Sequence, residues 1–199
     1  MDISLVKIKE KANKMDKVKS VLDVAKKLVA EGYKEGTNNN TIMGKWYGLN
    51  NQPWCAMFVS WCFNEAGLVH LTAAQSKKGF ASCDAGMKWY AKNGQLVPVG
   101  QAQAGDIVFF QFDDDKQPDH VGIVKSNDTL LKNLYVYEGN TAGNNKGSQS
   151  NGDGTYVKKR SYKLVMAVAR PNWDAPAPKV AAKKATPKKP VKKAAPKKK

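Results

Sequence analysis

Apolar residues near the start of the chain recur at helical spacing. From residue 18 to residue 29 they fall three or four positions apart, and Gly32 interrupts the pattern. The polar stretch at 36–41 that follows is typical of a loop. The sequence therefore predicts one helix close to the N-terminus, separated by a loop from the next elements.

The most apolar segment of the chain begins at Pro53. Residues 53–66 are apolar on almost every side, which is typical of a helix buried in a core, and Gly67 ends the segment. Proline suits the first turn of a helix because the amide hydrogen that it lacks has no partner there. A further short helix is predicted at 83–92, closed at Gly94.

The second half of the chain changes to short runs of β-branched and aromatic residues. Turns rich in Asp, Asn and Gly separate these runs, which is the pattern of strands in an antiparallel sheet. The predicted strands are residues 107–112, 121–125, 134–138, 155–159 and 165–169, with a long loop at 143–154. Helices followed by strands predict an α+β fold, with helices packed on a small antiparallel sheet.

Charge divides the chain unevenly. The formal net charge is +16, and residues 175–199 hold ten lysines and no acid, which leaves +6 for the first 174 residues. This C-terminal stretch is rich in Ala and Pro and has no aromatic residue, so a disordered basic tail is predicted. The expected organisation is an N-terminal helical segment at 1–33, a folded domain at 34–173 and the tail at 174–199.

No run of apolar residues approaches the ~20 needed to span a bilayer. Charges at Asp2, Lys7 and Lys9 interrupt the first residues before the apolar core of a signal peptide could form, so we expect synthesis in a cytoplasm without a classical export signal. Three cysteines, Cys55, Cys62 and Cys83, cannot all pair with one another and do not suggest a disulfide framework. At least one thiol is therefore free, and a reactive cysteine is a hypothesis from the outset.

Histidine is scarce, which limits metal chemistry. The sequence contains only His70 and His120, whereas a catalytic zinc site uses two or three histidines beside a cysteine or carboxylate. No paired-ligand spacing and no glycine-rich phosphate loop is present. We expect neither a metal nor a cofactor.

A thiol and an imidazole offer a different chemistry. Cys55 falls in the first turn of a predicted helix, where free amide groups favour a thiolate and can receive an oxyanion. His120 begins a predicted strand, and a third polar group has to orient its ring. Glu138 and Asn140, at the end of the next strand, are the candidates for that group.

Each of these residues also has a structural interpretation. An isolated cysteine is more often a small core residue, and Cys62, Cys83 and His70 keep that interpretation. Most tryptophans are expected in the core as well. Among the aromatic residues, the candidates for substrate binding are Trp46, Tyr47 and Trp54.

Four segments resemble the CHAP family (cysteine, histidine-dependent amidohydrolase/peptidase). Residues 53–62 resemble its nucleophile helix, 104–110 its first core strand, 119–124 its histidine strand and 137–141 its acid/amide strand. They occur in the family's order between about Lys34 and Arg170. One such segment is a weak signal, but the ordered set is specific.

The resemblance implies a papain-like fold that hydrolyses an amide bond of bacterial cell-wall peptide. Cys55 would attack the carbonyl, and His120 would accept its proton and later protonate the leaving amine. Glu138 is similar to the residue that orients the histidine, and Asn140 to a further polar member beside it. The domain at 34–173 would then be the catalytic one.

The family is common among phage endolysins, so peptidoglycan is the expected partner. Synthesis in the host bacterial cytoplasm, action at the wall after release, and a monomer without a stable protein partner are expected. Some members bind calcium through acidic residues ahead of the nucleophile, but the region at 38–41 has no Asp, and no metal is expected. The lysine-rich tail is expected to bind anionic wall polymers.

Three alternatives remain open from the sequence. NlpC-type peptidases also use Cys followed by His, although their third residue is usually another His, and only one His follows Cys55. A polyanion-binding or nucleic-acid-binding protein that acts through its basic tail belongs to a different class. A virion structural protein without activity is the third.

Overall fold

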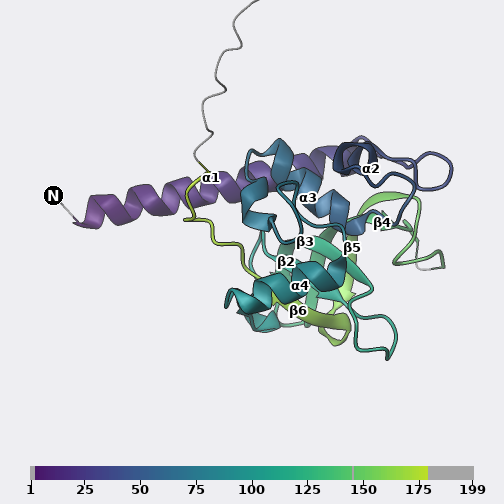
Figure 1. The fold of residues 1–199 in the computed structure, drawn as a ribbon. Coiled ribbons are helices and arrows are strands. Elements are labelled where there is room, and N and C mark those ends of the chain that lie inside the picture. The colour runs from purple at the N-terminus through teal and green to yellow at the C-terminus, as the bar shows by residue number, and fades with distance from the viewer. Residues whose placement is uncertain (1–2, 145, 179–199) are drawn as a thin grey trace, which may run out of the picture.

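The computed structural model describes residues 3–144 and 146–178, with the side chains described from Lys7 onward. The last 21 residues of the basic tail lie outside this part, so the expectation of disorder at 179–199 is not addressed. Helices and a six-stranded antiparallel sheet form the molecule, which confirms the α+β prediction (Figure 1). No helix among the described residues combines the length and apolarity needed to cross a membrane.

Four α-helices come mainly from the first half of the chain. They are α1 (Ile3–Ala30), α2 (Ile42–Tyr47), α3 (Cys55–Glu65) and α4 (Cys83–Lys92), with single 3-10 turns at Val69–Thr72, Val99–Gln101 and Tyr162–Leu164. The N-terminal half of α1 projects from the body of the molecule (Figure 1). Its C-terminal half enters the same core as α3, through Val21, Ala25 and Leu28.

The strands are β1 (Leu96–Val97), β2 (Ile107–Phe110), β3 (His120–Asp128), β4 (Asn133–Thr141), β5 (Gly154–Ser161) and β6 (Val165–Ala169). Their order across the sheet is β1-β6-β2-β3-β4-β5. Helix α3 packs on the neighbouring strands β3 and β4, and α4 packs on β6. The most apolar helix therefore covers β3, which begins with His120, and β4, which holds Glu138 near its end.

Alternation along β2 divides the core between the two faces of the sheet. Ile107 and Phe109 join the cluster that contains α1 and α3, whereas Val108 and Phe110 join a smaller cluster with Val136 of β4. A strand that is apolar at every position is buried on both faces. All four residues of β2 are buried, so apolar clusters cover both faces of the sheet at this strand. Strand β3, which pairs with β2, lies between the same two clusters.

Candidate active site

Cys55 is the first residue of α3, directly after the N-cap residue Trp54. The indole nitrogen of Trp54 donates a 2.6 Å hydrogen bond to Glu35 Oε2, which holds the start of the helix in place. The first backbone bond of the helix runs from Phe58 N to Trp54 O, so the amides of the first turn keep their free ends near Cys55. The sequence pattern predicted that Pro53 lies in the first turn of this helix, but α3 begins at Cys55, two residues after Pro53.

Gly139 lets strand β4 approach the start of α3 closely. A Cβ atom there would lie 2.5 Å from Trp54 Cζ3 and 2.7 Å from Phe58 Cβ, both inside contact distance. Only a glycine leaves room for this packing. Since Glu138 precedes Gly139, the close approach brings that carboxylate to the Cys55 end of the helix.

His120 is the first residue of β3, and its side chain is fully buried. Its Nε2 atom lies 3.0 Å from Glu138 Oε2. The ring is flanked by Phe110 and Phe112, at centroid distances of 6.3 and 6.0 Å. Nδ1 has no hydrogen-bond partner within the described part of the chain, so it is the ring atom left to exchange a proton with Cys55.

The pKa values of this pair shift in opposite directions. A hydrogen bond from Cys83 lowers the pKa of Cys55, burial opposes this, and His120 lowers it further, to well below its ordinary value. Burial alone would lower the pKa of His120, but Glu138 and Cys55 together raise it to about 9. These directions favour a thiolate paired with an imidazolium at neutral pH.

Cys83 is the first residue of α4, and its Sγ lies 3.6 Å from Cys55 Sγ. This separation is a contact between free thiols, since a disulfide needs ~2.05 Å. The Cys55 neighbour and burial raise the pKa of Cys83 well above its ordinary value, so Cys83 keeps its proton. The sequence pattern predicted a structural role for Cys83, although this residue also begins a predicted helix, which is the signal that pointed to Cys55.

Arg160 of β5 was not singled out from the sequence. Its Nε donates to Glu138 Oε1 at 2.8 Å and its Nη2 to Glu138 Oε2 at 2.5 Å, in a buried two-point contact. Burial raises the pKa of Glu138, but Arg160 and His120 bring it below its ordinary value. The carboxylate is thus ionised while it faces the histidine.

Asn140 lies two residues after Glu138, where the pairing of β4 with β5 shifts register. Its backbone is left-handed, with φ of 61°, a conformation that Asn tolerates better than most residues. The Nδ2 atom donates to Ser150 O at 3.0 Å, and Oδ1 has no partner in the described part of the molecule. Asn140 is therefore beside Glu138, and its hydrogen bond ties the β4–β5 loop rather than His120.

The candidate substrate-binding aromatics divide into two groups. Trp54 is 0% exposed and packs edge-on against Tyr33, so its predicted place in a substrate groove is wrong. It is core because the indole anchors the start of α3. Trp46 and Tyr47 of α2 are half-buried, and Trp46 also packs against Trp61.

One group of acidic side chains in the described residues has the spacing of possible metal ligands. Asp113, Asp115 and Asp119, in the loop before His120, bring one oxygen each within 4.8 Å of the others. The sequence did not identify this group as a site.

A buried thiol at a helix start, an imidazole and a carboxylate on adjacent strands form the arrangement of cysteine-dependent hydrolases. In comparison with known families, the CHAP domain model matches residues 46–140. The match spans Cys55, His120 and Glu138, and it supports a CHAP-family protein with amidohydrolase or peptidase activity of the cysteine/histidine type. No curated protein matches the chain.

Proposed function

We propose that this protein is a peptidoglycan hydrolase of the phage endolysin type, with Cys55 as its nucleophile. The observation that carries the proposal is the linked set Cys55, His120 and Glu138, in which the carboxylate holds one ring nitrogen and leaves the other for the thiol. The CHAP domain match supports an amidase-type function. The peptidoglycan substrate and the phage origin are carried by the sequence resemblance.

In the first half of the proposed reaction, the Cys55 thiolate attacks the carbonyl carbon of a wall amide bond. The negative charge moves to the carbonyl oxygen, which the free amides at the start of α3 can stabilise. The His120 imidazolium then gives its proton to the amine nitrogen as the C–N bond breaks. The amine leaves, and an acyl thioester remains on Cys55.

In the second half, water attacks the thioester carbonyl while neutral His120 accepts a proton from it. The C–S bond breaks, the acid product leaves, and the thiolate–imidazolium pair is restored. Glu138 keeps the imidazole ring in one orientation during both proton transfers. Asn140 shapes the β4–β5 junction beside Glu138, and the half-buried rings of Trp46 and Tyr47 are the proposed substrate contacts.

A matched pair of cysteine variants tests the proposal. Cys55→Ala should abolish lysis of purified walls while the circular dichroism spectrum is unchanged, since the side chain lost is small. Cys62→Ala is the control, because Cys62 lies in the same helix and is buried away from the histidine. Clearing of wall suspensions by Cys55→Ala at the wild-type rate would remove the thiol mechanism.

The bond that is cut is a separate measurement. Mass spectrometry of digested peptidoglycan identifies each new amino terminus, and therefore separates cleavage at the sugar–peptide amide from cleavage within the peptide. The NlpC-type alternative is disfavoured by the contact that His120 makes with a carboxylate rather than with a second histidine.

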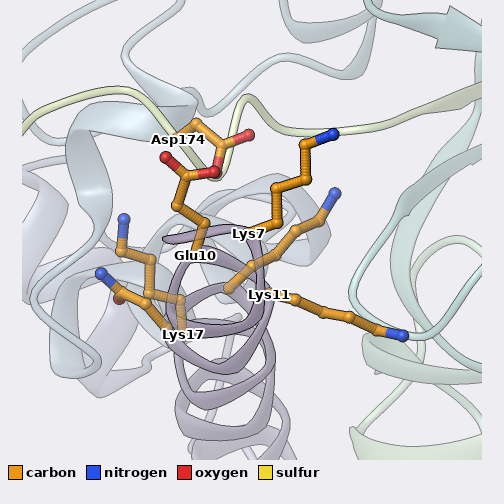
Figure 2. A pocket seen from close by; sticks show the side chains of 7 residues that line it. Lys7, Glu10, Lys11, Lys17 and Asp174 are labelled. Atoms are coloured by element: carbon orange, nitrogen blue, oxygen red, sulfur yellow. The ribbon is translucent and has the colours of Figure 1, made fainter. Parts of the chain in front are cut away.

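We propose polyanion binding as an accessory function. A hollow of ≈ 480 Å³ runs along the projecting half of α1, and four lysines line it, with Glu10 and Asp174 beside them: Lys7, Lys11, Lys14 and Lys17 (Figure 2). These four lysines belong to α1 and are additional to the ten lysines of the tail sequence. Both would attract the anionic polymers of a cell wall.

A further inference from the structure

Arg160 and His120 both contact the carboxylate of Glu138. The two guanidinium nitrogens Nε and Nη2 take one carboxylate oxygen each, and Oε2 is shared with His120 Nε2. A planar guanidinium in such a fork fixes both the position and the plane of the carboxylate. The orientation of the imidazole ring therefore depends on a residue that reaches His120 only through Glu138.

The guanidinium itself is held on several sides. Its carbon lies 5.6 Å from the Phe110 ring centre and 5.1 Å from that of Phe112, the two rings that also flank His120. Nη1 donates to Gln149 Oε1 at 3.0 Å, and Nη2 reaches Thr141 Oγ1 at 3.3 Å. With a residue exposure of 5%, Arg160 is a buried part of the site rather than a surface ion pair.

Charge balance gives Arg160 a second effect. A Cys55 thiolate, a His120 imidazolium and a Glu138 carboxylate would together leave one buried negative charge, and Arg160 neutralises it. Lys158, the other basic group on this face of β5, turns its ammonium to Ala142 O. Of these two basic side chains of β5, Arg160 is the one that pairs directly with Glu138.

We propose that Arg160 is a positioning residue, which holds Glu138 ionised and in the plane that fixes His120 for its partnership with Cys55. The proposal rests on the proposed thiol mechanism, but it does not depend on the substrate being peptidoglycan. Arg160 follows the segment that matches the CHAP domain, which ends at residue 140.

The test follows the reactivity of Cys55 and not only wall lysis. Alkylation of Cys55 by iodoacetamide, measured by mass spectrometry across pH, reports the thiolate in wild type, Arg160→Gln and Arg160→Lys. Without the guanidinium, Glu138 gains a proton at a higher pH, so the acid limb of the Cys55 profile should rise by about 1–3 pH units. Arg160→Lys keeps the charge but loses the fork, and should restore part of the shift.

Arg170→Gln is the matched control. Arg170 makes the same two-point contact with Asp106, through Nε at 3.0 Å and Nη2 at 2.8 Å, away from Cys55. The Arg170→Gln substitution should lower the melting temperature without moving the pH profile of Cys55 alkylation. The double variant Arg160→Gln/Glu138→Gln carries no unpaired buried charge, and its profile should equal that of Glu138→Gln alone.

An acid limb that stays at the wild-type pH in Arg160→Gln would overturn the proposal. So would a further shift in the double variant beyond that of Glu138→Gln, because Arg160 would then act by another route. If Arg160→Gln shifts the profile but the wild-type protein itself fails to lyse walls, the positioning role stands and the peptidoglycan assignment is removed.

Discussion

At the residue scale, two thiols from different helices compete for one proton. Cys55 and Cys83 begin α3 and α4, and their sulfur atoms lie 3.6 Å apart. The hydrogen bond between them lowers the pKa of Cys55 and raises that of Cys83. Cys83 therefore acts as the donor, and the negative charge stays on the sulfur next to His120.

Removal of this donor should make Cys55 a weaker nucleophile at neutral pH. A hydrogen bond to a charged group contributes about 1.5–3 kcal/mol, so Cys83→Ala should raise the pKa of Cys55 by about one to two units. The pH profile of Cys55 alkylation measures this shift. Cys83→Ser keeps a donor and should retain most of the wild-type behaviour.

Cys62→Ala is the control for this comparison, because burial raises the pKa of that thiol and Cys55 has no hydrogen bond to it. A Cys83→Ala profile that matches the wild type would show that His120 alone sets the thiolate.

The sequence indicated the residues of the site whose signal is local. Cys55 at a helix start, His120 at a strand start and Glu138 at the end of the next strand could each be identified from neighbouring residues. Arg160 could not, because its partner is 22 positions away and an arginine in an alternating strand is usually a solvated one. Trp54 was misassigned since an aromatic residue beside a nucleophile has the same local pattern in a groove and in a core.

At the scale of elements, the distance between α3 and β4 controls the site. The two elements touch at Gly139, where any side chain would overlap Trp54 and Phe58. Trp54 immediately precedes Cys55, and Glu138 immediately precedes Gly139. A change in this contact therefore moves the thiol relative to the carboxylate that orients His120.

Gly139→Ala should reduce activity more than it reduces stability. The added methyl group forces the helix and the strand apart, at a cost of about 1–3 kcal/mol for overpacking. Displacement of reacting groups by ~1 Å can lower a rate about 100-fold. Wall turnover and the melting temperature, measured together, separate the two effects.

Gly67→Ala is the matched control, because Gly67 ends the same helix with no atom near its Cβ position, although its φ is 73°. It should lower the melting temperature and leave turnover per folded molecule unchanged. Equal losses of turnover in the two variants would show that the helix tolerates displacement.

The sequence pattern predicted those elements that are long enough to show a repeat of apolar residues. The helix at 83–92 and the strand at 165–169 have the predicted bounds. Strand β1 is only two residues long, too short for a period, and α2 was missed although Thr41 caps it through a 2.9 Å bond from Gly44 N. Helix α1 begins well before residue 18. The apolar pattern did not reveal its first turns, because they are charged rather than amphipathic.

At the scale of the whole molecule, positive charge is concentrated in two segments of the sequence, the C-terminal stretch and the first half of α1. Ten lysines without an acid occupy residues 175–199, and four more line the hollow along α1. Exposed charges of this kind accelerate encounter with a polyanion and contribute little to a chemical step. Trp173 is buried against Phe63, so a chain that ends at Asp174 keeps this core contact.

Truncation after Asp174 should therefore weaken binding to whole walls while turnover of a small soluble fragment is retained. The loss should be greatest at about 0.01 M salt, where the screening length is ~30 Å, and small at about 0.1 M, where it is ~10 Å. Sedimentation of the protein with purified walls across a salt series measures the binding. Substitution of Lys7, Lys11 and Lys14 by Gln in the truncated chain should remove the salt-dependent part that remains. If the truncated chain binds walls as well as the full chain at low salt, the tail does not target the wall, and tight DNA binding lost on the same truncation would assign it to nucleic acid.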